Sequence, residues 1–392
     1  MNKTIRLYDQ DPYATSFQAA VLSCSPSEKK EGLYEVILDQ TLFFPEEGGQ
    51  SPDKGTLAGA ADAEAIKVVD VQIKAEVITH FLTSPLKEGT TVQGSICWNH
   101  RFSNMQQHSG EHLFSGLAHK HFGCTNVGFH LSDNEVTLDL DKPLTEENII
   151  FLEEEVNKII AANIERRVIF PTKEEEKDYD YRSKIEIEGQ TRLVEYPGVD
   201  LCACCAPHVA RTSEIGIFKV MSFKNYKGGV RVTILCGSRA FKALREEHDV
   251  LQKTARFLSA KPVEVYDLVN GLKDEIASLK QKLKEAGQAK LQFLLANVDP
   301  EAENVLVFAD EADMKNVRDI LNDLCTKHAG VCAIFVGSEN KYRFVMGSAS
   351  GKAAERLNKM KESVAIRGGG KPNMAEGSCQ GSEEEIRAAF QV

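Results

Sequence analysis

The chain has no long hydrophobic run and no export signal. Among its 392 residues, no apolar stretch approaches the length that a membrane-spanning helix needs. Its opening residues alternate between polar and apolar and include Asp9, Asp11 and Pro12, so they lack the apolar core of a signal peptide. We therefore expect a cytoplasmic protein without a membrane partner.

Positive charge is scarce in the chain as a whole. The formal net charge of −11 argues against a protein that coats nucleic acid through overall charge, because phosphate binding needs positive potential. Local positive charge is present between Lys219 and Arg245, where no Asp or Glu intervenes and aromatic residues are interleaved with the basic ones. We single out Lys224, Lys227, Arg231 and Arg239 as candidate nucleic-acid contacts. A solvated sheet edge explains the same segment equally well.

The ten cysteines do not form the compact pattern of a secreted disulfide framework. They are dispersed over a long chain, so reduced thiols are the better expectation. Three of them, Cys202, Cys204 and Cys205, crowd together beside His208. Such a cluster of thiols beside a histidine indicates a chemical role for these side chains.

The succession of patterns predicts an α+β protein of several domains. We expect a β-rich, barrel-like domain over 1–92, an α+β domain over 93–240, a helical arm over 241–297 and a small α/β domain over 298–392. In the first two domains, the predicted strands are Tyr34–Leu38, Ala65–Ile73, Val77–Leu82 and Glu135–Leu140. The predicted helices there are Ser103–His121, stopped by Gly123, and Thr145–Ile164, capped by Thr145.

The second half of the chain is predicted to begin with a long helix. Pro262 should break it into two pieces, and an apolar stripe along it would support dimerisation or packing against the same chain. Strands and helices then alternate. The predicted ranges are Val305–Phe308, Ala312–Lys327, Val331–Val336, Tyr342–Gly347 and Lys352–Glu362. The segment Arg367–Pro372 is expected to be irregular because it is rich in glycine.

Two pairs of residues at four-residue spacing predict a metal site. On a helix, His108 and His112 project from one face, and Cys204 and His208 repeat the spacing. Mixed imidazole and thiolate ligands favour zinc. Cys202 and Cys205 could compete with Cys204 as the thiolate ligand. Hydrolysis also needs a position for water or substrate, so one ligand, with His208 the first candidate, would be displaceable.

The same helix also fits the His-x-x-Glu-His motif of zinc proteases. In that interpretation Glu111 is the general base and both histidines are ligands. Such proteases take their third ligand from a carboxylate, whereas this chain offers Cys204 and His208. A protease therefore remains as the weaker alternative.

The segment Asp39–Gln50 ends in paired glycines, which allow a backbone to approach a ligand closely. Thr41 and Gln50 add hydrogen-bonding side chains to it. A simple hairpin turn explains the spacing as well.

Taken together, these motifs resemble the editing domain of alanyl-tRNA synthetases, in the family's order. The resemblance rests on Thr41–Gln50 with Asp53 and Gly55, on Arg101 and Asn104 before His108 and His112, on Cys204 and His208, and on Arg211–Lys219. The segment Gly368–Ala375 is similar to the tail of the C-terminal domain that follows editing in those synthetases. We find no ATP-binding motif and no room for an aminoacylation domain before Tyr34, so the chain resembles the freestanding long AlaX-type trans-editing family.

The resemblance implies a zinc-dependent deacylase that hydrolyses mischarged tRNA(Ala), chiefly Ser-tRNA(Ala) and secondarily Gly-tRNA(Ala). The zinc ligands it implies are His108, His112, Cys204 and His208, with Thr41 and Gln50 at the amino-acid pocket. It also implies tRNA binding and homodimerisation through the C-terminal part, where Gly369, Gly370 and Lys371 are the candidate contacts. One departure is Cys-Cys-Ala-Pro-His at 204–208, where the family often has Cys-Gly-Gly-Thr-His. A tRNA-binding module without hydrolysis remains a further alternative.

Overall fold

The computed structural model describes residues 3–59, 64–183 and 190–391. Its contacts divide the chain into two compact units, Met1–Val250 and Leu251–Val392. The predicted α+β class is confirmed, while the finer division into four domains stays a prediction. No helix in the described part of the chain is both long and apolar enough to cross a membrane.

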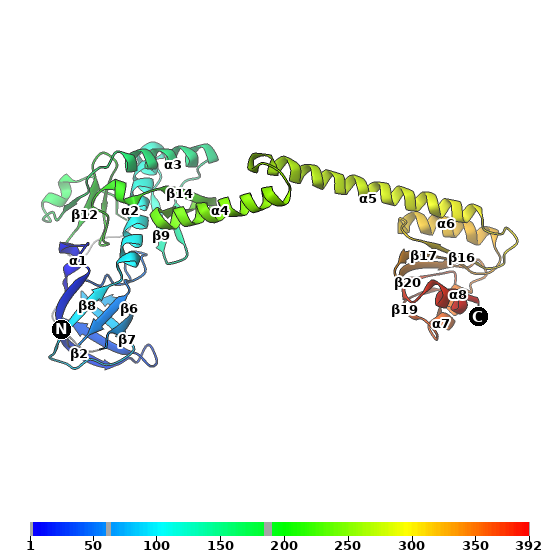
Figure 1. Ribbon diagram of the computed structural model, residues 1–392, viewed down its shortest axis with the longest axis horizontal. Coiled ribbons are helices and arrows are strands. Elements are labelled where there is room, and N and C mark those ends of the chain that lie inside the picture. Colours follow the sequence, from blue (N-terminus) through cyan, green and yellow to red (C-terminus); the bar gives the residue numbers. More distant parts are fainter. Residues whose placement is uncertain (1–2, 60–63, 184–189, 392) are drawn as a thin grey trace. The chain divides into compact units, whose positions relative to one another are not determined.

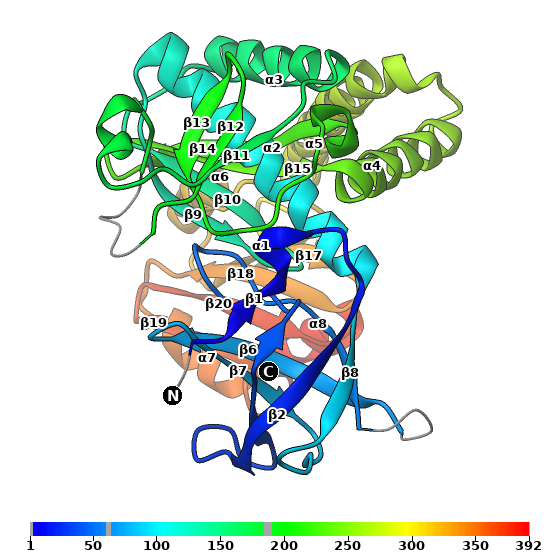
Figure 2. The same ribbon diagram turned by 90° about the vertical axis from the view of Figure 1, so that its left-hand side faces the viewer.

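The first unit begins with a closed six-stranded barrel, in the region where the sequence predicted a β-rich, barrel-like domain (Figures 1 and 2). Its strands are joined in the order β2-β3-β7-β6-β5-β8. Alternate residues point inward, which is why β8 reads as a strict succession of exposed and buried positions. The barrel strands are β2 (Ser16–Pro26), β3 (Tyr34–Leu38), β5 (Gly55–Ala58), β6 (Ile66–Lys74), β7 (Val77–Leu82) and β8 (Thr91–Ile96). Beside it lie β1 (Ile5–Arg6), α1 (Leu7–Gln10) and β4 (Gln40–Thr41), with β1 paired to β4.

Helix α2 (Trp98–Phe122) leaves the barrel and runs through the interior of the unit (Figure 1). It begins five residues before the predicted Ser103. Its first turn has no side-chain cap, so no capping motif in the sequence marks this start. It ends as predicted at Gly123, whose φ of 62° is the left-handed conformation that favours glycine.

Two sheets and a helix surround α2. The four-stranded sheet has the order β14-β15-β10-β9, and the three-stranded sheet has the order β11-β12-β13. Helix α3 (Glu146–Ala161) starts at the predicted cap, where Thr145 and Asn148 bond reciprocally. The strands are β9 (Asn126–Leu131), β10 (Val136–Leu140), β11 (Arg167–Ile169), β12 (Leu193–Tyr196), β13 (Asp200–Ala203), β14 (Phe218–Tyr226) and β15 (Gly229–Cys236), and 3₁₀ turns span Glu175–Asp178 and Thr212–Ile215.

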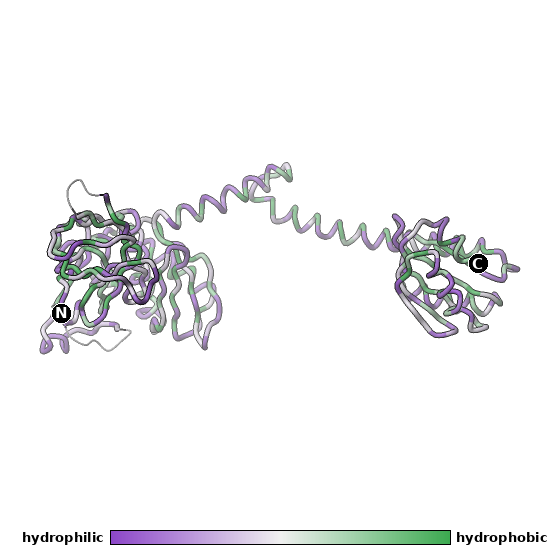
Figure 3. The backbone as a smooth tube through the Cα atoms, turned by 90° about the horizontal axis from the view of Figure 1, so that it is seen from below, coloured by the Kyte–Doolittle hydropathy of each residue, from purple (hydrophilic) through white to green (hydrophobic). Residues whose placement is uncertain are grey.

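Two long helices follow, separated where the sequence predicted. Helix α4 (Gly237–Phe257) ends before the 3₁₀ turn Pro262–Glu264, and α5 (Val265–Ala296) starts after it. Hydrophobic and hydrophilic residues alternate along both helices (Figure 3). Many of the apolar side chains on α5 are exposed, including Leu272 and Ile276.

The second unit ends in a five-stranded sheet of order β16-β17-β18-β20-β19. Helix α6 covers one face, and α7 and α8 pack with the core of the other face (Figure 1). The strands are β16 (Val305–Ala309), β17 (Cys332–Ser338), β18 (Lys341–Gly347), β19 (Ala365–Lys371) and β20 (Met374–Gln380), and the helices are α6 (Met314–Lys327), α7 (Ala353–Met360) and α8 (Glu383–Gln391).

The prediction that the glycine-rich segment Arg367–Pro372 is irregular was wrong. Most of it belongs to β19, which pairs with β20 in antiparallel register. A Cβ at Gly370 would lie only 2.2 Å from the carbonyl oxygen of Met374. Glycine therefore permits a close approach between the two strands here.

Candidate metal centre

Helix α2 carries the first pair of predicted ligands into the interior. His108 and His112 lie one helical turn apart, and 3% and 2% of their surfaces are exposed. Their ring centroids are 5.4 Å apart. Burial of both rings on one helix face gives two imidazoles that can act together.

The second pair comes from the turn after β13. Arg192 holds this turn, because its Nη1 donates to the carbonyl oxygens of Cys204 at 2.7 Å and Ala206 at 3.1 Å. The side chains of His108, His112, Cys204 and His208 meet there, with their potential ligand atoms all within 4.8 Å of one another. The Cys204 Sγ lies 3.3 Å from His208 Nε2 and 3.6 Å from His108 Nε2. The structure thus brings together the four residues predicted from the sequence.

Each of the three imidazoles has a different partner at Nδ1. His108 Nδ1 is 2.8 Å from Gln50 Oε1, His112 Nδ1 is 3.0 Å from Asp200 Oδ2, and His208 Nδ1 is 3.2 Å from Ser109 Oγ. With Nδ1 engaged, Nε2 is the atom left for a metal.

Two of the donor separations are those expected around a tetrahedral zinc ion. With a Zn–S bond of about 2.3 Å and Zn–N bonds of about 2.05 Å, sulfur and nitrogen ligands are about 3.6 Å apart. The observed separations of 3.3 and 3.6 Å are close to that value. Zinc ligation stays a prediction for which the donor set is suitable.

Electrostatics favours Cys204 over its neighbours as the thiolate. Burial opposes ionisation of Cys204, but His108 and His208 outweigh it and hold the pKa of this thiol well below its usual value. Burial raises the pKa of Cys202 and of Cys205, so neither of these thiols ionises as readily. The structure also groups Cys202 with His112 and Asp200 and not with the four-residue cluster.

The glycine-rich loop of the barrel places Gln50 at this cluster. Gln50 is 1% exposed, and its Oε1 accepts from His108 Nδ1. Its Nε2 is buried and has no hydrogen-bond partner among the described residues. The sequence suggested Gln50 but not its bond to His108.

Thr41 is not one of the four clustered residues; it is fully buried on β4, the short strand that precedes the glycine-rich loop with Gln50. Its Oγ1 is 2.9 Å from His80 Nε2 and accepts from the backbone N–H of Phe43 at 3.0 Å. His80 Nδ1 faces the carbonyl oxygen of Val36 at 3.2 Å, so Nδ1 carries the proton and Nε2 accepts from Thr41. Sequence reasoning missed His80, which no local motif marks.

Glu111, the general base of the protease interpretation, belongs to a buried polar network. Its Oε1 accepts from Ser115 Oγ at 2.6 Å and from Asn126 Nδ2. Asn126 also donates to Ser115 at 3.1 Å. This network links α2 to β9 and gives Glu111 a structural role.

The candidate RNA contacts of the first unit fall into two groups. Lys224 on β14 and Lys227 in the following turn are exposed. Arg231 forms two bonds of 2.6 and 2.7 Å to Asp139, and Arg239 donates to Ser103, Asn104 and Ser132. β14 is an edge strand, as the alternative interpretation of this segment expected.

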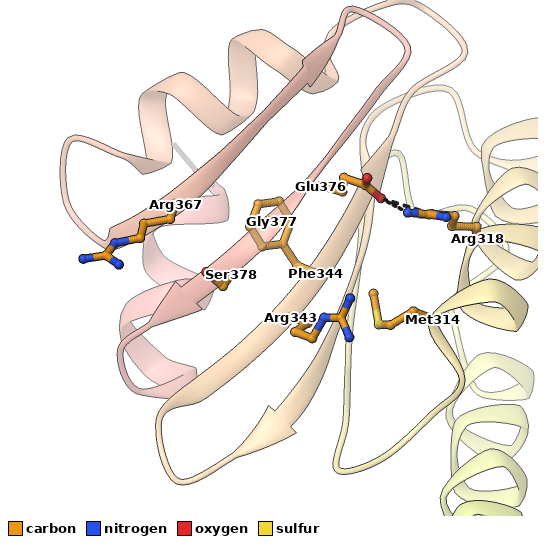
Figure 4. Close-up of a pocket in the computed structure, with 8 residues that line it drawn as sticks. All are labelled: Met314, Arg318, Arg343, Phe344, Arg367, Glu376, Gly377 and Ser378. Atoms are coloured by element: carbon orange, nitrogen blue, oxygen red, sulfur yellow. Dashed lines mark hydrogen bonds and ion pairs between the residues drawn. The ribbon is translucent and has the colours of Figure 1, made fainter. Parts of the chain in front are cut away.

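The second unit has a pocket of about 450 Å³ on its sheet (Figure 4). Arg343, Ser378 and Arg367 stand opposite one another on β18, β20 and β19, so they form a row across three strands. Gly369 and Lys371 follow Arg367 on the same face of β19. The pocket is lined by Met314, Arg318, Arg343, Phe344, Arg367, Glu376, Gly377 and Ser378. No sequence pattern marks Arg343 and Arg367, because only the strand register aligns them.

Two family profiles match parts of the first unit. Residues 15–100 match the family described as tRNA synthetases class II (A). Residues 191–233 match the threonyl and alanyl tRNA synthetase second additional domain, which spans the turn with Cys204 and His208.

Several curated proteins match much more of the chain. The alanyl-tRNA editing protein AlaX-L of Pyrococcus horikoshii is 28% identical over 97% of this chain and 96% of its own length. The alanine–tRNA ligase of Ignicoccus hospitalis is 30% identical over 98% of this chain, and the mouse alanyl-tRNA editing protein Aarsd1 is 33% identical over 62% of it. The chain spans 42% of that ligase and 61% of the mouse protein. By sequence, the chain belongs to the family of long AlaX-type alanyl-tRNA editing proteins.

Proposed function

We propose that the protein is a trans-editing hydrolase, which cleaves the ester bond of tRNA(Ala) charged with the wrong small amino acid. The observation that carries this proposal is the convergence of three buried imidazoles and one half-buried thiol, in a chain related to editing proteins over nearly its whole length. The preferred substrate is Ser-tRNA(Ala), followed by Gly-tRNA(Ala).

In this proposal, His108, His112, Cys204 and His208 hold a zinc ion. When bound, zinc supplies a Lewis acid that polarises a carbonyl or lowers the pKa of a water. His208 is the ligand that we expect to give way to water or substrate. Gln50 is fixed by His108, so its free Nε2 donors are available to the carbonyl oxygen of the ester.

In this proposal, Thr41 discriminates mischarged serine from correctly charged alanine. A synthetase pocket for alanine cannot exclude glycine by size, nor strongly reject serine, so a second hydrolytic site is required. The Thr41 hydroxyl donates a hydrogen bond to His80 Nε2, and one of its lone pairs accepts from the backbone N–H of Phe43. The remaining lone pair would accept from the hydroxyl of serine, for which alanine has no equivalent.

We propose that the tRNA is held at two surfaces. One consists of Lys224 and Lys227, while Arg231 and Arg239, engaged within the protein, shape it. The other is the exposed edge strand β19 with Gly369, Gly370 and Lys371, next to the row of Arg343, Ser378 and Arg367. Guanidinium groups suit phosphates, and glycines let the RNA backbone approach closely. We also propose homodimerisation through α5.

The test is the release of amino acid from Ser-tRNA(Ala), Gly-tRNA(Ala) and Ala-tRNA(Ala) by the full chain. We expect fast release of serine, slower release of glycine and little release of alanine. Binding of every tRNA without release of any amino acid would favour the non-hydrolysing alternative. Peptide cleavage that depends on Glu111, without deacylation, would favour the protease.

A further inference from the structure

His112 differs from the other two histidines in the charge of its Nδ1 partner. Gln50 and Ser109 offer neutral groups, whereas Asp200 offers a carboxylate at 3.0 Å. Both side chains of the His112–Asp200 pair are almost completely buried. A buried carboxylate fixes the ring of a histidine and makes its Nε2 a stronger metal donor.

Arg182 completes the arrangement behind the carboxylate. Its Nε donates to Asp200 Oδ1 at 2.7 Å, so the two oxygens of Asp200 face different partners. The backbone of Arg182 is anchored to β13, because its N–H donates to Leu201 and its carbonyl accepts from Ala203, both at 2.9 Å. The positive charge of Arg182 compensates the buried negative charge of Asp200. Without Arg182, that carboxylate would be costly to bury.

Gly116 on α2 leaves space for the side chain of Asp200 on β13. It lies one turn beyond His112, on the same helix face. A Cβ at position 116 would lie 2.7 Å from Asp200 Cβ and 3.0 Å from Asp200 Oδ1. It would also lie 2.7 Å from the backbone oxygen of Val199, so the clash could not be relieved by a side-chain rotation alone.

His112, Asp200 and Cys202 could by themselves be taken for a second metal site. The Arg182 guanidinium opposes this, since it already occupies one carboxylate oxygen and places a positive charge where a cation would bind. The geometry suits support of one ligand better than a second centre.

We propose that Asp200, held by Arg182 and admitted by Gly116, positions His112 and sets the metal affinity of the four-residue cluster. Asp200 is thus a positioning residue, since it acts through His112. The inference rests on the proposed function only in that the cluster binds a metal.

The test measures zinc affinity by competition with a chelator, and the absorption spectrum of the cobalt-substituted protein. Asp200→Ala should weaken zinc binding about 10- to 100-fold and alter the cobalt spectrum. Asp200→Asn keeps an acceptor without the charge, so it should rescue part of the loss. Arg182→Gln and Gly116→Ala should each weaken binding by displacing the carboxylate. The matched control is Asp139→Asn, which alters an arginine-paired carboxylate on β10 outside the cluster.

The proposal is overturned if Asp200→Ala folds like the wild type and its zinc affinity and cobalt spectrum are unchanged. If Asp200→Ala does not fold, unchanged affinity and spectrum in both Asp200→Asn and Arg182→Gln overturn it equally. Failure of the proposed function is a separate outcome. A wild type that binds zinc and loses it in the Asp200 variants, yet releases no amino acid, would support this inference and contradict deacylation.

Discussion

Cys204 is one of three neighbouring thiols, and its surroundings set it apart. Its Sγ faces the Nε2 atoms of His108 and His208, whereas Cys205 lies beside Gly48 of the barrel loop. The sequence predicted that one thiol of this turn joins the histidines. The hydrogen bonds that orient the turn come from Arg192, and no local sequence pattern connects this residue to the turn.

Replacement of the thiol should separate catalysis from RNA binding. We expect Cys204→Ala to slow serine release by more than the roughly 10- to 100-fold that loss of an outer partner costs, because a ligand itself is lost. Affinity for tRNA should change little, since the half-buried Cys204 faces His108 and His208 and is not one of the proposed RNA contacts. Filter binding and deacylation on the same preparation check both. Full activity in Cys204→Ala, with loss in Cys205→Ala, would show that the other thiol is the ligand.

His80 should make the first unit less stable in acid. Burial lowers its pKa to about 4, compared with about 6.5 in an unfolded chain. The unfolded state therefore binds the extra proton between these values, and stability is lost as the pH falls below 6.5. Relative to His80→Gln, the wild type should lose about 2 kcal/mol between pH 7 and pH 5. Urea unfolding followed by the fluorescence of Trp98 measures this, and parallel pH profiles of the two proteins would contradict it.

At the scale of elements, α2 joins the barrel to the metal centre through one buried ion pair. Arg101, at 0% exposure, donates from Nε to Asp53 at 3.0 Å and from Nη1 to the carbonyl oxygen of Pro12 at 3.0 Å. It also bonds the carbonyl oxygen of Leu42. These contacts fix the start of α2 against the barrel loops, and with it the distance from Gln50 to His108.

Loss of this arginine should destabilise the unit strongly. Arg101→Leu leaves the carboxylate of Asp53 buried without its partner, which costs about 3–5 kcal/mol. The exposed pair of Arg211 and Glu165 is the control, and Arg211→Leu should cost at most about 1 kcal/mol. Urea unfolding of the two variants compares them directly. Equal small losses would show that Arg101 is dispensable.

Periodic patterns predicted most elements of the fold. Strands β3 and β7 have the predicted bounds. As predicted, Thr145 caps the start of α3 and Pro262 lies in the turn that separates α4 from α5. The failure at β19 has a physical cause, since glycine can mark close strand contact as well as irregular backbone. The pairing of Thr41 with His80 and the row of arginines were unpredictable because they depend on strand register and barrel closure.

At the scale of the whole molecule, helix α5 presents an apolar stripe. Leu272, Ile276, Leu279 and Leu283 lie on one face of the helix and are 44–58% exposed. The helix packs within its own unit near its C-terminal end, where Leu291 is buried. A second copy of the helix could cover the stripe.

Charges on that stripe should produce monomers. We expect the wild type to sediment at twice the chain mass, and the double variant Leu272→Glu/Ile276→Glu at the chain mass, because two carboxylates would enter the apolar contact. Ser278→Glu/Gln281→Glu adds the same charge to the opposite face and should remain dimeric. A wild type that is monomeric at all concentrations would refute dimerisation through α5.

We propose above all that a metal held by His108, His112, Cys204 and His208 drives the release of serine from Ser-tRNA(Ala). The most direct measurement determines bound zinc and the rate of serine release in the same samples of wild-type protein, before chelation, after chelation and after zinc is restored. We expect one zinc per chain, loss of serine release when the metal is removed and recovery of both together, while Ala-tRNA(Ala) stays intact throughout. Undiminished serine release from fully chelated protein would contradict the proposal.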